Sequence, residues 1–108
     1  MVLEHAVFTI TPGSGEPFEA ALAQARHLLA ATPGCLSLAL HRSIEDPNRY
    51  VLLVSWDTIE AHTTGFRQSD AYPQWRSLIS PYFAEDPTVE HLTAVDLAAI
   101  EHGAEQAG

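Results

Sequence analysis

Histidine is the residue type that carries most of the chemical signal in this chain. His62 lies three residues after Ile59 and four before Phe66, in a segment that reads as a helix. These spacings put the three side chains on one helical face, which would turn His62 toward an apolar core. A neutral imidazole can accept a proton near physiological pH, so His62 is a candidate base toward a phenolic substrate. The alternative is a structural histidine, hydrogen-bonded within the core.

Two further histidines lie on predicted strands near the two ends of the chain. His5 belongs to the first strand and His91 to the last, and in the expected sheet these strands are antiparallel neighbours. We therefore expect the two rings to meet across the ladder, as a structural pair or as part of a pocket lining. Two nitrogens fall short of the three or four protein ligands of a usual zinc site, and the chain has no CxxC or HExxH motif. No metal is expected.

Aromatic side chains gather in the second half of the chain. Tyr72, Trp75 and Arg76 lie in a break between predicted helical segments, where loops commonly line binding sites. Together with Phe66 they would form a flat, mostly apolar pocket for an aromatic ligand, with Arg76 or Tyr72 orienting its oxygen. The alternative is that the rings serve the core alone, since aromatics supply much of the buried area of a small domain.

Hydrophobic periodicity and cap signals predict the elements that must position these residues. One helix is expected to begin at Pro17 and to end before the Pro33-Gly34 turn, with an apolar stripe along one face. A second helix opens at a capping box from Asp57 to Glu60, and Ser69 would cap a further helical segment that ends near Ser80. Strands are expected at residues 2–10, 35–42, 49–56 and 87–95, and residues 97–108 form a tail, either a frayed helix or a loose end.

The resulting β-α-β-β-α-β order predicts an α+β, ferredoxin-like fold with a four-stranded antiparallel sheet and both helices on one face. In a sheet with one solvent-exposed face, each strand should alternate apolar and polar residues. The segments Leu36–Leu40 and Tyr50–Val54 instead lack charge on both faces. Because monomers rarely expose large apolar patches, a second copy is expected to pack sheet to sheet and form a homodimeric α/β barrel.

Composition narrows the class of partner. The 108 residues suffice for one domain, expected at 1–96, and their formal charge of -9 with no lysine disfavours nucleic acid and anionic membrane surfaces. Cys35 is the single cysteine, the N-terminal segment does not suit a signal peptide, and no apolar run reaches the length of a membrane span. A soluble cytoplasmic protein is expected.

The amino-acid sequence of residues 1–96 resembles that of the antibiotic biosynthesis monooxygenase (ABM) family of small dimeric α+β barrels. The matching elements are Arg42-Ser43, Glu45-Asp46-Pro47, Arg49-Tyr50, Trp56, Glu60-Ala61-His62, Phe66, Ser69 and Trp75. The family includes cofactor-independent monooxygenases of polycyclic phenols, quinol oxidases and haem-degrading enzymes. The haem-degrading branch relies on an asparagine, a tryptophan and a histidine at positions that hold His5, Phe66 and Arg76 here. Haem degradation is therefore not expected.

The resemblance implies an oxygenase that uses neither metal nor flavin, because the deprotonated substrate itself supplies the electrons to dioxygen. On this hypothesis the substrate is a small phenol, quinol or anthrone, His62 is the base and Arg76 holds the anion. The expected pocket residues are His5, Phe66, Tyr72, Trp75 and His91. Two alternatives remain: a non-catalytic small-molecule-binding or stress-related barrel, and an isomerase of a small carbonyl compound.

Overall fold

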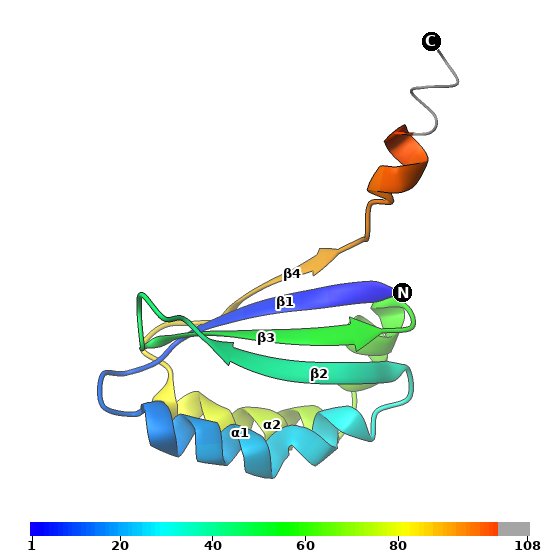
Figure 1. Cartoon of the computed structure of the whole chain (residues 1–108). Coiled ribbons are helices and arrows are strands. Elements are labelled where there is room, and N and C mark those ends of the chain that lie inside the picture. Colours follow the sequence, from blue (N-terminus) through cyan, green and yellow to red (C-terminus); the bar gives the residue numbers. More distant parts are fainter. Residues whose placement is uncertain (102–108) are drawn as a thin grey trace.

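The computed structural model describes residues 1–101 and has two layers, a sheet and a layer of helices (Figure 1). The elements in chain order are β1 Val2–Thr9, α1 Gly15–Ala30, β2 Cys35–Arg42, β3 Arg49–Trp56, the π-helix η1 Ala61–Phe66, α2 Ala71–Ile79, the short 3-10 helix η2 Ser80–Tyr82 and β4 Thr88–Leu92.

The sheet has four antiparallel strands in the order β2-β3-β1-β4. Both long helices cover the same face of the sheet (Figure 1). This arrangement confirms the predicted α+β, ferredoxin-like fold. No helix within residues 1–101 is long and apolar enough to span a membrane.

The core lies between the sheet and the helices. The predicted stripe of α1 is confirmed, since Phe18, Leu22, Ala25 and Leu29 are all at most 4% exposed. Alternate residues of β1 and β3 meet this stripe, as expected for strands with one face toward a core. The buried strand residues are Ala6, Phe8, Tyr50, Leu52, Val54 and Trp56.

The opposite face of the sheet has no helix over it (Figure 1). Its central strands present Leu3 and Val7 from β1 and Val51 and Leu53 from β3, all of them only partly buried within the single chain. These four apolar side chains surround His5, which lies between Leu3 and Val7 on β1 and opposite Leu53 on β3.

The region after β3 differs from the predicted α-helix. Its main turn is a π-helix. The Arg67 N–H donates to the carbonyl of His62, which lies five positions earlier in the chain. Thr58, rather than Asp57, caps its beginning by accepting from the Ala61 N–H at 3.1 Å. The wider turn also changes which residues share a face: His62 and Phe66 are buried, but Ile59 is 38% exposed.

Other boundaries moved by a few residues. The helix α1 begins two residues before Pro17, α2 begins at Ala71, and β4 is shorter at both ends than the expected range 87–95. Ser69 does not cap α2, because its hydroxyl donates to the Phe66 carbonyl at 2.6 Å. Residues 97–101 are helical, with Asp96 accepting from the Ala99 N–H, and the rest of the predicted tail lies outside the described residues.

Candidate active site

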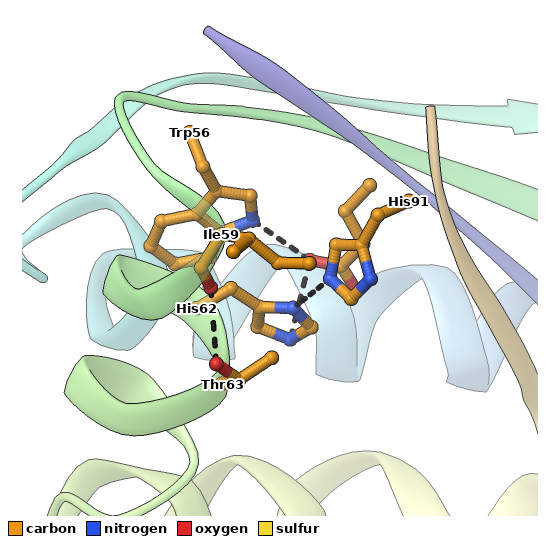
Figure 2. A network of polar contacts seen from close by, with 6 residues as sticks. Trp56, Ile59, His62, Thr63 and His91 are labelled. Carbon is orange, nitrogen blue, oxygen red and sulfur yellow. Dashed lines mark hydrogen bonds and ion pairs between the residues drawn. The ribbon is translucent and has the colours of Figure 1, made fainter. Parts of the chain in front are cut away.

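Three titratable side chains form a chain of polar contacts between the sheet and the helical layer. The central one is His62, whose Nε2 lies 3.4 Å from Glu4 Oε1 and whose Nδ1 lies 2.8 Å from His91 Nε2. Figure 2 shows the His62 ring between Trp56 and His91. Glu4 and His62 are 5% and 3% exposed, whereas His91 is only partly buried. The chain of contacts therefore runs from the core toward the β4 edge.

The register of the sheet places two of these residues together. Glu4 pairs with His91 across the β1–β4 ladder, so both side chains point to the helix-covered face. His62 reaches the same place from the π-helix η1, and its ring stacks on Trp56 at a centroid distance of 5.1 Å. The indole of Trp56 also donates from Nε1 to Glu4 Oε1 at 3.0 Å.

The predicted meeting of His5 and His91 is wrong. His5 pairs with Glu90, one residue away from His91, and its Nδ1 lies 3.8 Å from Glu90 Oε1. Because neighbouring residues of a strand point to opposite faces, this one-residue offset puts His5 on the uncovered face of the sheet. The partner of His91 is His62, and neither His5 nor His91 is among the residues that line the pocket described below.

Glu4 is the site residue that the sequence reasoning missed. The signal was present, since Glu4 lies at the same strand parity as Ala6 and Phe8, which are core positions. A carboxyl at such a position is unusual, because a buried charge is costly unless it is paired. Here the indole of Trp56 and the imidazole of His62 supply the partners.

A pocket opens beside this chain of contacts, between the sheet and α2. Its cavity volume is about 50 Å³. An aromatic ligand would therefore have to displace side chains at the mouth. The pocket brings together five residues predicted for the site, which are His62, Phe66, Tyr72, Trp75 and Arg76, and it adds Glu4 and Arg67.

The walls of this pocket are aromatic and its mouth is cationic. Phe66 packs edge to face against Tyr72 and Trp75, with ring centroids 5.5 and 5.9 Å apart. Arg76 lies over the Phe83 ring, 5.5 Å from its centroid. Arg67 and Arg76 belong to none of the ion pairs formed within residues 1–101. Neither guanidinium group therefore has a carboxylate partner in this part of the chain.

Burial sets the protonation of the three titratable groups. It raises the pKa of the Glu4 carboxyl, although the Trp56 hydrogen bond and the charge of Arg67 partly offset it. It lowers the pKa of His62 to about 4, assisted by the charges of Arg67 and His91. The pKa of His91 is lowered too, by burial and by Arg67. Both imidazoles are therefore neutral at physiological pH.

The same geometry does not suit a metal ion. The two ring nitrogens of His62 point in opposite directions, one to Glu4 and one to His91, so the three residues do not converge on one point. Residues 1–101 contain no group of three His, Cys, Asp or Glu side chains that could hold a metal. The site in this part of the chain consists of protein side chains around an apolar pocket.

Comparison with known proteins identifies the family. A model of the antibiotic biosynthesis monooxygenase family matches residues 1–78. The chain belongs to this family. The matched range covers β1 to α2 and therefore includes Glu4, His62 and most of the pocket wall.

Relatives within and around the ABM family cover nearly the whole described chain. A Bordetella bronchiseptica protein assigned to the antibiotic biosynthesis monooxygenases is 45% identical, with a TM-score of 0.85 over 88% of this chain and 97% of its own. The Bacillus subtilis protein YczJ, which is uncharacterized, is 38% identical over 88% of this chain and 100% of its own. SnoaB, a cofactor-independent oxygenase from Streptomyces nogalater, shares the ABM fold at 21% identity, with a TM-score of 0.73 over 88% of this chain and 93% of its own.

Proposed function

We propose that this ABM protein is a cofactor-independent monooxygenase of a small phenol, quinol or anthrone. In the case of a phenol, one atom of dioxygen bonds to the ring carbon opposite the hydroxyl. The other atom leaves as water with two hydrogens from the substrate, and the product is a quinone. The substrate supplies all the electrons, so the protein has to bind it, deprotonate it and keep water away.

The observation that carries this proposal is the buried chain of Glu4, His62 and His91 along an apolar pocket. Deprotonation needs a base beside the substrate, and this chain reaches the pocket through Glu4 and His62. The aromatic rings of Phe66 and Trp75 offer a flat wall for an aromatic substrate. SnoaB, with the same fold, is a cofactor-independent oxygenase, which agrees with this chemistry.

The cationic mouth supports the second requirement, which is stabilisation of the substrate anion. Arg67 and Arg76 line the same pocket. They are two of only five cationic residues in a chain of net charge -9. A phenolate or enolate held between them would gain charge-assisted hydrogen bonds. Dioxygen would then react with a substrate that the protein has already deprotonated and bound as an anion.

Dioxygen uptake tests the proposal. Purified protein is mixed with a panel of phenols, quinols and anthrones in an oxygen electrode, after dialysis against a metal chelator. We expect uptake of one dioxygen per substrate molecule with at least one member of the panel, and the matching quinone by mass spectrometry. Saturable binding without uptake would favour the non-catalytic barrel. A product isomeric with a carbonyl substrate, formed without dioxygen, would favour the isomerase.

A glutamine at position 62 tests the role of the buried chain. The amide of His62→Gln can still donate to Glu4 and accept from His91, so folding should be kept, whereas the imidazole is lost. We expect turnover to fall, by up to the roughly 10²–10⁴-fold contribution of a positioned acid–base group, because the variant removes either the base itself or the group that positions it. The control is His27→Gln, an exposed histidine on α1 whose contact is the nearby Gln24 carbonyl. Unchanged turnover in a folded His62→Gln protein would contradict the proposal.

A further inference from the structure

The two carboxylate oxygens of Glu4 have different surroundings. Oε1 accepts from the Trp56 indole at 3.0 Å and lies 3.4 Å from His62 Nε2. The contacts of Glu4 within residues 1–101 involve Oε1, and none of the hydrogen bonds there reaches Oε2. Yet no buried side-chain oxygen or nitrogen in this part of the chain lacks a partner. Oε2 therefore keeps some exposed surface although Glu4 as a whole is only 5% exposed, and the pocket is the open space that Glu4 lines.

His62 is placed differently. Its Nε2 points to Glu4 and its Nδ1 to His91, so both ring nitrogens are already directed at protein groups. A neutral imidazole has one N–H and one lone pair. If Nε2–H donates to the Glu4 carboxylate, the lone pair of Nδ1 accepts from His91. A ligand in the pocket then meets no free lone pair on His62.

We propose that Glu4 is the catalytic base of the reaction, that its Oε2 takes the substrate proton, and that His62 and His91 position it. This inference rests on the proposed oxygenase function. The substrate O–H or C–H bond breaks, an O–H bond forms on Oε2, and the electron pair stays on the substrate as an anion between Arg67 and Arg76. After dioxygen adds to a ring carbon of the anion, the protonated Glu4 returns its proton to the outer peroxide oxygen. The hydrogen on that ring carbon then leaves as a proton, the O–O bond breaks as the new C=O bond forms, and the departing hydroxide takes up this proton and leaves as water.

The charges around Glu4 suit this role. The groups that face it are the indole of Trp56 from β3, His62 from η1, His91 from β4, and the guanidinium of Arg67 that follows η1. Cys35 lies near it on β2. Burial raises the pKa of this carboxyl, which makes its anion a stronger base than a solvated glutamate. A carboxyl tuned in this way accepts a proton more readily than a solvated glutamate and can still return it.

Variants on one strand ladder separate this role from a structural one. Glu4→Gln keeps the shape and the acceptor for Trp56 but removes the base, and we expect kcat to fall by about 10²–10⁴-fold. The matched control is Glu90→Gln, on the same β1–β4 ladder but pointing to the opposite face, and it should leave kcat unchanged. An acidic phenol at high pH should partly restore Glu4→Gln, because hydroxide in the solvent then removes the proton.

A second readout needs no turnover and is made with p-nitrophenol, which turns yellow when it is deprotonated. Below the pKa of the free phenol, wild-type protein should convert bound p-nitrophenol to the yellow anion. An infrared difference spectrum of wild type should then show the C=O stretch of a newly protonated carboxylic acid. Glu4→Gln should give neither signal, and Glu90→Gln should give both.

The possible results distinguish the assignment of Glu4 as the base from the proposal that the protein is an oxygenase. A Glu4-dependent colour change and carboxylic acid band would support Glu4 as the base even if no substrate consumed dioxygen, and the proposed oxygenase function alone would then fail. A colour change that persists in Glu4→Gln but is lost in His62→Gln would overturn the inference and make His62 the base. A wild-type protein that forms no phenolate would also overturn it.

Discussion

At the scale of single residues, the site consists of a carboxyl and an imidazole that lie side by side in a buried position, where both favour the neutral form. Desolvation opposes the charged form of both Glu4 and His62. The pair is therefore kept neutral overall, or charged only on Glu4, where Trp56 and Arg67 favour the anion.

The same two shifts predict an unusual pH dependence of stability. The pKa of His62 is about 4 in the folded chain and 6.5 ordinarily, so the unfolded chain binds more protons between these values and folding stability rises with pH. The upper bound of this effect is about 3 kcal/mol, at 1.36 kcal/mol per pKa unit. Glu4 acts in the opposite direction, because its raised pKa makes the folded chain bind more protons above pH 4.5.

We therefore expect the two contributions to cancel partly in the wild type and to separate in variants. Glu4→Gln removes the opposing contribution, so its urea midpoint should rise more steeply between pH 4.5 and 6.5 than that of the wild type. His62→Gln should show a flatter or falling midpoint over the same range. The measurement is urea unfolding followed by tryptophan fluorescence at several pH values. Parallel curves for all three proteins would show that the pair is not coupled to folding.

Sequence reasoning found most of the pocket but only part of the chain of titratable groups. Helical spacing sufficed for His62 and Phe66, because both stay buried in a wider turn as well. The predicted contact between His5 and His91 was wrong. The residues that share a face within each strand were assigned correctly, but the register between the two strands was off by one residue. Register depends on pairing across distant parts of the chain, and a shift of one residue exchanges the faces. Glu4 was missed because the apolar residues of β1 lie on both faces of the strand, so the sequence did not show which face belongs to the core.

At the scale of elements, the π-helix η1 depends on a close approach between two turns. Gly34, before β2, has φ +89°, and a Cβ built there would lie 2.6 Å from the Cβ of Ala61, the first residue of η1. The Gly34 carbonyl also accepts from the Asp57 N–H at 2.8 Å. The loop that starts β2 thus fixes where η1 begins and, one residue later, where His62 lies. No local signal in the sequence predicted a π-helix, since the fit against Gly34 arises only in the folded chain.

Substitution of this glycine tests the dependence. Gly34→Ala should destabilise the fold by about 1–2 kcal/mol from its left-handed φ, and by about 1–3 kcal/mol more from the overlap with Ala61. The matched control is Gly13→Ala, which has φ +85° but nothing within 4 Å of the new Cβ, so it should carry only the first cost. Chemical unfolding measures both. Equal losses in the two variants would show that the contact with Ala61 yields easily. A displaced η1 should also lower turnover in Gly34→Ala but not in Gly13→Ala.

At the scale of the whole molecule, the two faces of the sheet pose different problems. The helices bury one face, and the boundaries that sequence patterns placed there were correct to within a few residues, because local periodicity and core burial agree. The other face has no cover within residues 1–101, and its central strands present Leu3, Val7, Val51 and Leu53 around His5. Leu92 of β4 pairs with Leu3 on this face and is 38% exposed. Such a patch is more than a small monomer usually exposes to water.

We expect a second copy to cover this face through a two-fold, self-complementary contact, because the same apolar patch is then buried twice. Light scattering on a sizing column should give about twice the 11.8 kDa mass of the chain at micromolar concentration. Leu53→Lys, at the centre of the patch, should shift the mass to that of one chain or cause aggregation, since a buried charge without a partner is costly. Gln24→Lys adds the same charge to the exposed side of α1 and should leave the dimer intact. A stable wild-type monomer, or a Leu53→Lys protein that remains a dimer, would show that the uncovered face is not the contact between copies.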